Sequence, residues 1–146
     1  MNQIILETEQ STQLFAEKLA DQCDYKNKNL KIFLIGDLGT GKTTFTRYFI
    51  KAFGWQGKVK SPTYTLIEHY ALSDLDIYHL DLYRLADAQE LTFLGLEDIF
   101  NKPQSIILIE WPQKAGDLLP SPDIILKFDY INNQDTMRSV AVDYNR

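Results

Sequence analysis

The sequence is poor in cysteine, and Cys23 is the single one among 146 residues. One thiol cannot close a disulfide within the chain, which excludes a disulfide-stapled secreted domain and favours a reducing compartment. The first ten residues, MNQIILETEQ, lack the basic and long apolar segments of a secretory signal peptide. We therefore expect a cytoplasmic protein in which Cys23 is a small buried hydrophobe and not a reactive thiol.

Long apolar runs are also missing. No run approaches the roughly 20 apolar residues that a membrane-spanning helix needs, so we expect no membrane contact. With 45% apolar and 24% charged residues, the chain has the composition of an ordinary globular protein, and its length suits one hydrophobic core. The sequence therefore predicts a single domain over residues 1–146, which we expect to be a monomer when it is alone.

Basic charge is scarce, and the formal net charge is −5. Affinity for a nucleic-acid backbone is built from clustered Lys and Arg, so this balance argues against a protein that binds nucleic acid mainly by itself. Any role on RNA then needs a partner that carries most of the contacts. Small-molecule kinases commonly clamp two sets of phosphates with several arginines. The chain has only four, which are Arg47, Arg84, Arg138 and Arg146.

The first third of the sequence predicts a strand, a helix, a buried strand and a second helix. The first strand lies near residues 4–6, and Ser11 or Thr12 can cap the helix that follows. Residues 30–36, LKIFLIG, are nearly all apolar, as in a strand buried on both faces of a sheet. Gly54 can end the second helix. Apolar stripes face a core from Phe15, Ala16, Leu19, Ala20 and Cys23 in one helix and from Phe45, Tyr48, Phe49 and Ala52 in the other.

The remaining sequence predicts two hairpins around a helix and a buried strand. Residues 63–72 and 76–85 have strand-like composition, and a turn near Ser73 and Asp74 can join them. A helix is expected from about Asp87 to Phe100, followed by the buried strand SIILIEW at residues 105–111. Residues 123–144 contain two alternating runs around NNQD, which predicts a terminal hairpin.

A phosphate-binding motif follows the first buried strand. Residues 36–43, GDLGTGKT, match the pattern G-x-x-x-x-G-K-[ST] in full. Glycines let the backbone curl so that several N–H groups point into one hollow, and the helix that follows adds its positive end. Lys42 can reach the β- and γ-phosphates there, and the Thr43 hydroxyl can ligate Mg²⁺. The motif predicts a nucleoside triphosphate site in an α/β, P-loop NTPase-like three-layer fold, whose mixed parallel and antiparallel central sheet has helices on both faces.

Two carboxylates end strand-like runs where a metal-bound triphosphate needs them. Asp81 lies in IYHLDLYR, and Glu110 ends IILIE directly before Trp111. From position alone, either residue can hold Mg²⁺, directly or through water, while the other orients the attacking water. The alternative for each is a solvated carboxylate at a strand end.

Three further features carry weaker signals. Thr63 follows Pro62 in a loop after the first crossover helix, where P-loop switch segments sense the γ-phosphate, although Ser-Pro-Thr is also an ordinary strand-entry turn. His69 and His79 complete no CxxC or HExxH pattern, so we expect satisfied or exposed histidines and not metal ligands. Trp111 is most simply a packing residue.

Several separated segments resemble one family together. In order, they are GDLGTGKTTFTR, GKVKSPTYTLIEHY, YHLDLYRLADAQELTFLGLEDIF, IILIEWPQKAGDLLP and the closing hairpin. They resemble the TsaE (YjeE) family of bacterial P-loop ATPases over nearly the whole chain. SPTYTL, DLYRL and IEWP are far more selective than the phosphate loop alone, and Thr40 stands where the family often has Ala.

The resemblance implies an ATPase required for the threonylcarbamoyladenosine modification of tRNAs that read codons beginning with A. It implies TsaB and TsaD as partners, tRNA contact only through that complex, and no transfer of the threonylcarbamoyl group by this chain. ATP and Mg²⁺ are the implied cofactors. Catalysis would rest on Asp81, Glu110 and Lys42, and the metal on Thr43, Asp81 and Glu110. Nucleotide contacts are implied at Leu38, Gly39, Thr40, Gly41, Lys42, Thr43, Thr44, Thr63 and Arg138.

Two other functions stay open at the level of sequence. One is a nucleotide-gated module whose bound state controls a partner with little turnover. The other is a small-molecule kinase, against which the scarce arginines count.

Overall fold

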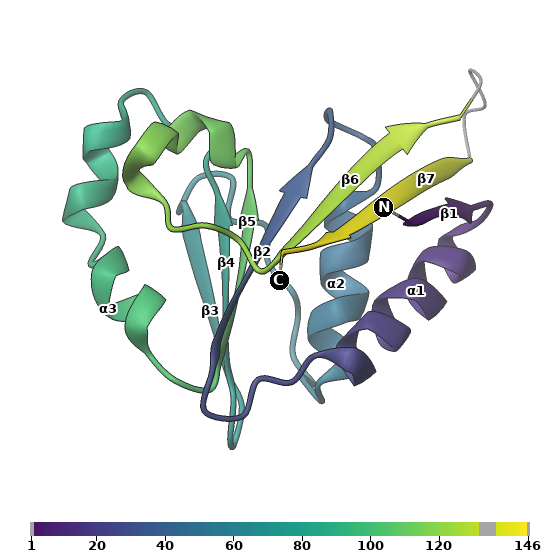
Figure 1. Ribbon diagram of the computed structural model, residues 1–146, viewed down its shortest axis with the longest axis horizontal. Coiled ribbons are helices and arrows are strands. Elements are labelled where there is room, and N and C mark those ends of the chain that lie inside the picture. Colours follow the sequence, from purple (N-terminus) through teal and green to yellow (C-terminus); the bar gives the residue numbers. More distant parts are fainter. Residues whose placement is uncertain (1, 132–136, 146) are drawn as a thin grey trace.

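The computed structural model describes residues 2–131 and 137–145, and its centre is one seven-stranded β-sheet (Figure 1). The strand order is β1-β7-β6-β2-β5-β4-β3. In chain order the strands are β1 (Asn2–Leu6), β2 (Asn29–Ile35), β3 (Ile67–Ala71), β4 (Asp76–Asp81), β5 (Ser105–Glu110), β6 (Ile124–Tyr130) and β7 (Arg138–Tyr144).

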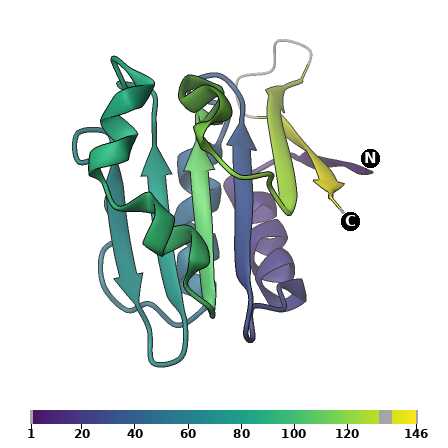
Figure 2. The same ribbon diagram turned by 60° about the vertical axis from the view of Figure 1, so that its left-hand side comes forward.

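The middle of the sheet is parallel. β2 pairs with β5 and β6, and β4 pairs with β5, all in parallel. Figure 2 shows the arrowheads of β2, β4 and β5 at the same end of the sheet. All six residues of β5 are buried, as its continuous apolar sequence predicts for a strand covered on both faces. The carboxyl ends of three neighbouring strands therefore meet at one edge.

Antiparallel strands extend both sides of this parallel core. β3 pairs with β4, β7 pairs with β6, and β1 pairs with β7. The predicted terminal hairpin is confirmed in its two strands, while its NNQD turn falls outside the described residues. β3 and β4 are shorter than predicted. Leu66 has φ +69°, which interrupts extended backbone before β3, and the Asp81 carboxylate accepts the N–H of Tyr83 in a turn that ends β4.

Helices cover both faces of the sheet, which confirms the predicted three layers. On one face lie α1 (Glu9–Gln22) and α2 (Lys42–Ala52), and on the other lie α3 (Leu96–Asn101) and two 3₁₀ segments, η1 (Ala88–Phe93) and η2 (Pro112–Leu118) (Figure 1). No helix within residues 2–131 and 137–145 is long and apolar enough to cross a bilayer.

Two helix predictions were wrong in detail. Thr8, and not Ser11 or Thr12, caps α1, because its hydroxyl accepts the N–H of Ser11 at 3.1 Å. The helix predicted over Asp87 to Phe100 is broken into η1 and α3. Gly95 between them has φ +67°, a left-handed conformation that an α-helix cannot pass through. Asp87 does start this region, in a capping box with Glu90.

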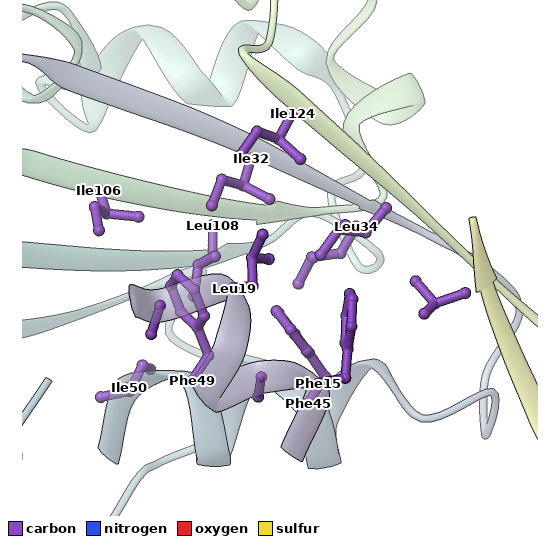
Figure 3. Packing of buried hydrophobic residues seen from close by; sticks show 14 of the residues in the cluster. Phe15, Leu19, Ile32, Leu34, Phe45, Phe49, Ile50, Ile106, Leu108 and Ile124 are labelled. Carbon is purple, nitrogen blue, oxygen red and sulfur yellow. The ribbon is translucent and has the colours of Figure 1, made fainter. Parts of the chain in front are cut away.

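The main core fills the space between the sheet and the α1–α2 pair. Figure 3 shows Phe15 and Phe45 from the two helices facing Ile32 and Leu34 from β2. Phe45 is fully buried, and its ring lies 5.3 to 5.6 Å, centroid to centroid, from three other phenylalanine rings. This packing fixes α2, and with it the loop that α2 follows. Cys23 packs beside this core, and burial raises the pKa of its thiol to about 11, which fits an unreactive side chain.

We expect Phe45→Ala to lower the free energy of unfolding by about 3–5 kcal/mol, because it leaves a cavity beneath the phosphate loop. Urea denaturation followed by circular dichroism measures the change. Leu14→Ala, at a 61% exposed position on α1, is the control and should change stability by less than about 0.5 kcal/mol. Equal effects of the two substitutions would contradict this view of the core.

Candidate functional site

The loop between β2 and α2 forms the floor of the site. Gly41 is the N-cap residue of α2 with φ +106°, and Gly39 has φ +82°. These left-handed conformations are ones that other residues adopt only with strain. A Cβ at Gly39 would also lie 2.7 Å from the hydroxyl of Tyr130, whereas a Cβ at Gly41 would meet nothing within 4 Å. The glycines of the motif are therefore required by backbone conformation, and at Gly39 by a close neighbour as well.

The terminal hairpin holds this loop from the side. The Tyr130 hydroxyl donates to the carbonyl of Leu38 at 3.1 Å, and Nε of Arg138 donates to the carbonyl of Gly39 at 3.2 Å. The Arg138 guanidinium also lies 4.3 Å from the centroid of the Tyr130 ring, in cation–π contact. Arg138, predicted through the family resemblance, is thus brought to the phosphate loop from about a hundred residues away.

A pocket of about 330 Å³ opens above the loop and gathers every predicted site residue except Thr40. The Thr40 side chain is buried, and its hydroxyl donates to the carbonyl of Asp37 at 2.7 Å, so it stabilises the loop from within. The predicted residues that line the pocket are Leu38, Gly39, Gly41, Lys42, Thr43, Thr44, Thr63, Asp81, Glu110 and Arg138.

Lys42 is buried at the centre of the site. Its Nζ donates to the carbonyl of Gly36, lies 3.9 Å from Oε1 of Glu110, and sits 4.4 Å from the centroid of the Trp111 ring. Burial lowers the pKa of the lysine, while the negative charges of Glu110, Asp81 and Asp37 oppose that shift. Lys42 therefore lies against Glu110 and the Trp111 ring in the pocket that the phosphate loop lines.

The two predicted carboxylates meet across the sheet. Asp81 and Glu110 are the last residues of β4 and β5, and they are direct partners in the parallel register. The pKa of Asp81 is raised, first by burial and also by the charge of Glu110, against the lowering effects of the Tyr83 N–H, of nearby His79 and of the Lys42 charge. Two carboxylates in direct opposition repel each other, so a cation between them is favoured.

The donor set of the pocket fits Mg²⁺ together with phosphate. Among residues 2–131 and 137–145, no three His, Cys, Asp or Glu side chains gather closely enough to hold a metal by themselves. Mg²⁺ commonly takes one or two carboxylates, with phosphate oxygens and water in its other positions. Thr43, Asp81 and Glu110 line the same pocket as the phosphate loop, so they match that mode of binding.

Sequence reasoning missed several residues of the site. Leu6, Thr8, Glu9 and Thr12, from β1 and the start of α1, also line the pocket, and no sequence motif points to them. His79 was expected to be satisfied or exposed and not a metal ligand; it is paired, as that prediction allowed, but its link to the site was not foreseen. The histidine is buried, and its Nε2 lies 2.7 Å from Oε2 of Glu110. The spacing of His79 two residues before Asp81, on one face of a strand, was the available signal. Trp111, treated as a packing residue, covers Lys42.

A larger groove of about 720 Å³ lies between α3 and η2 and contains none of the predicted site residues among those described. Leucines such as Leu91 and Leu96 line it together with exposed acidic residues. The convergence of charged and phosphate-loop groups, and not the size of the hollow, therefore identifies the functional site.

We expect Gly39→Ala to weaken nucleotide binding more than Gly41→Ala. Both impose left-handed strain of about 1–3 kcal/mol, but only the first adds a clash with Tyr130. The double variant Gly39→Ala, Tyr130→Phe should recover part of the loss, because it removes the clashing hydroxyl. Calorimetric titration with ADP measures the three affinities, and no recovery in the double variant would contradict the clash.

Asp81→Asn should stabilise the fold at pH 7. The folded pKa of Asp81 is raised above its ordinary value of 3.8, so the unfolded chain gives up this proton first as the pH rises. The resulting penalty is fully present above the folded pKa and vanishes below 3.8. The gain in melting temperature should therefore shrink as the pH falls through the folded pKa and be absent below 3.8. Asp117→Asn, at an exposed position, is the control, and a lower melting temperature for Asp81→Asn at pH 7 would contradict this account.

Comparison with known proteins gives relatives whose aligned regions cover most of this chain. A protein described as tRNA threonylcarbamoyladenosine biosynthesis protein TsaE from Haemophilus influenzae is 48% identical over 117 residues, covering 80% of this chain and 73% of the relative. A protein of the same description from Rickettsia bellii is 36% identical over 144 residues, covering 98% and 96%. The crystal structure of Bacillus subtilis YdiB superposes with a TM-score of 0.74 at 26% identity, covering 95% of this chain and 82% of that one.

The model of the family described as Threonylcarbamoyl adenosine biosynthesis protein TsaE matches residues 6–140. That range runs from the end of β1 into β7 and includes all the pocket residues named above. On this match, and on relatives that share about a third to a half of its residues, the chain belongs to the TsaE family.

Proposed function

We propose that this protein is a Mg²⁺-dependent ATPase that acts in the threonylcarbamoyladenosine modification of tRNA, together with TsaB and TsaD. One observation carries the proposal. A complete phosphate loop, a buried lysine and two opposed carboxylates converge on a single pocket at the carboxyl ends of β2, β4 and β5. In open α/β sheets, this edge is where ligands bind.

Lys42 supplies positive charge for the β- and γ-phosphates. It is buried, so its charge acts in a medium less polarisable than water, where electrostatic stabilisation is stronger. Its present partners, the Gly36 carbonyl and Glu110, both contact the end of the flexible lysine side chain, so a short movement of that side chain can exchange them for phosphate oxygens. The loop N–H groups and the positive end of α2 add to the same field.

Thr43 and Glu110 are the residues we assign to Mg²⁺, and Asp81 to the attacking water. When bound with the triphosphate, the metal neutralises charge on the β- and γ-oxygens. Glu110 is 5% exposed and close to the phosphate-loop lysine, which suits an ionic ligand. Asp81 is more open to the pocket, and its raised pKa makes it a better proton acceptor than an ordinary carboxylate.

The net charge of the chain favours a mechanism in which a partner protein makes most of the contacts with the RNA. The chain has a net charge of −5 and four arginines, so it is poorly suited to hold an RNA backbone alone. The relatives named above are described as tRNA threonylcarbamoyladenosine biosynthesis proteins. A small acidic ATPase meets that role if TsaB and TsaD carry the tRNA and this chain supplies the energy of hydrolysis to their complex.

Phosphate release in the presence and absence of TsaB, TsaD and tRNA tests the proposal. We expect slow release by the chain alone and faster release in the complex. Lys42→Ala should lower the rate about 100-fold or more, because it removes a charge aimed at the transferring phosphoryl group. Lys51→Ala, at an exposed lysine on the same helix, is the control and should leave the rate unchanged. Equal rates for Lys42→Ala and the unmodified protein would refute an ATPase at this site.

Asp81→Ala separates turnover from nucleotide-gated binding. If hydrolysis drives the modification, the variant should bind TsaB and TsaD yet fail to support threonylcarbamoyladenosine formation. Full modification without phosphate release would instead show that the bound state of the nucleotide is sufficient. Liquid chromatography of nucleosides from the reacted tRNA gives the readout.

A further inference from the structure

His79 lies behind the pocket and touches it only through another side chain. It comes from β4, is 2% exposed, and its Nε2 lies 2.7 Å from Oε2 of Glu110. The pocket wall on this side is formed by Asp81 and Glu110. The hydrogen-bonding contact between His79 and the pocket therefore runs through the Glu110 carboxylate.

The second ring nitrogen fixes the direction of this hydrogen bond. Nδ1 of His79 is buried and has no hydrogen-bond partner among the described residues. A proton on Nδ1 would bury an N–H without an acceptor, and it would leave two lone-pair atoms, Nε2 and Oε2, facing each other at 2.7 Å. With the proton on Nε2, the contact with Glu110 is a hydrogen bond, and only the lone pair of Nδ1 stays without a partner. His79 is then a hydrogen-bond donor whose acceptor is Oε2 of Glu110.

The two oxygens of Glu110 are divided between different neighbours. Oε2 accepts from His79, while Oε1 lies 3.9 Å from Nζ of Lys42. Without the histidine donor, the carboxylate is free to rotate and present both oxygens to the lysine. That rotation would draw Lys42 away from phosphate and turn Oε1 away from the metal. The Glu110 carboxylate would then also be free to turn toward Asp81, its partner on β4, and the two negative charges would repel each other.

We propose that His79 is the positioning residue of Glu110, and that its Nε2–H donation holds Oε1 toward the pocket for Mg²⁺ bound with a nucleotide. The assignment rests on the proposed function in one respect, namely that Glu110 serves a metal–nucleotide complex. Residues that orient a ligating carboxylate affect metal affinity although they never touch the metal. His79 therefore controls the affinity for Mg²⁺ more than the affinity for the nucleotide.

Two substitutions separate donation from packing. His79→Gln can place an amide N–H near the position of Nε2, whereas His79→Leu fills much of the space without a donor. We expect Mg²⁺ titrated calorimetrically into protein saturated with ADP to bind about 10–100-fold more weakly to His79→Leu. His79→Gln should bind Mg²⁺ within a few-fold of the unmodified protein, and ADP affinity measured in EDTA should be the same in all three. Equal Mg²⁺ affinity for His79→Leu and the unmodified protein overturns the proposal, as does equal loss in both variants.

A measurement without metal or nucleotide tests the hydrogen bond itself. Nitrogen chemical shifts of the His79 imidazole, recorded by long-range ¹H–¹⁵N correlation, should show the proton on Nε2. A proton on Nδ1 overturns the positioning role whatever the binding data show. Failure of the unmodified protein to bind ADP with Mg²⁺ overturns both the proposed function and this inference. Normal binding with an unaffected His79→Leu variant overturns only the inference.

Discussion

The parallel ladder of β2, β5 and β4 is the constraint on which the rest of the structure depends. β5 is buried at all six positions, with β2 on one side and β4 on the other. Side chains alternate between the faces of a strand, so a slip of one residue would turn Glu110 to the opposite face of the sheet. The observed register places Glu110 opposite Asp81 and beside Leu34, at the end of β2 from which the phosphate loop leaves.

The charges at this edge are arranged for a ligand more than for stability. A buried lysine has a lowered pKa, and an aspartate opposite a glutamate has a raised one, so each is partly destabilised in its charged form. Functional sites commonly keep such groups because their interactions improve only when the ligand is bound. The Phe45 cluster and the two flanking antiparallel hairpins supply the packing that lets the fold carry them.

The terminal hairpin shows how distant sequence enters the site. Tyr130 and Arg138 donate to carbonyls of the phosphate loop, which limits the conformations that the loop can adopt. β6 of this hairpin pairs with β2, so the central ladder sets the position of the hairpin. A loop that must present several N–H groups in one direction gains preorganisation from neighbours that bind its carbonyls.

Local signals in the sequence were accurate where the chain determines its own conformation. The phosphate loop, the strands at residues 30–36 and 105–111, and the face of α2 that carries Phe45 and Phe49 were predicted because glycine spacing and apolar periodicity depend on residues close together in the chain. Ala52, predicted to belong to the same face of α2, is exposed instead. The cap at Thr8 and the break at Gly95 were missed because several residues at each place had acceptable capping or helical character. Neither error touches the phosphate loop.

By itself, the sequence determined the phosphate loop, the α/β layers and the positions of Asp81 and Glu110 at strand ends. Only the tertiary structure decided that these carboxylates oppose each other, that Lys42 lies buried beneath Trp111, that Arg138 reaches Gly39, and that Nε2 of His79 lies against Glu110. The physical reason is one of range. Motifs and periodicity arise from neighbours along the chain, whereas these contacts depend on strand order and register, which are set by how the whole sheet buries its apolar faces.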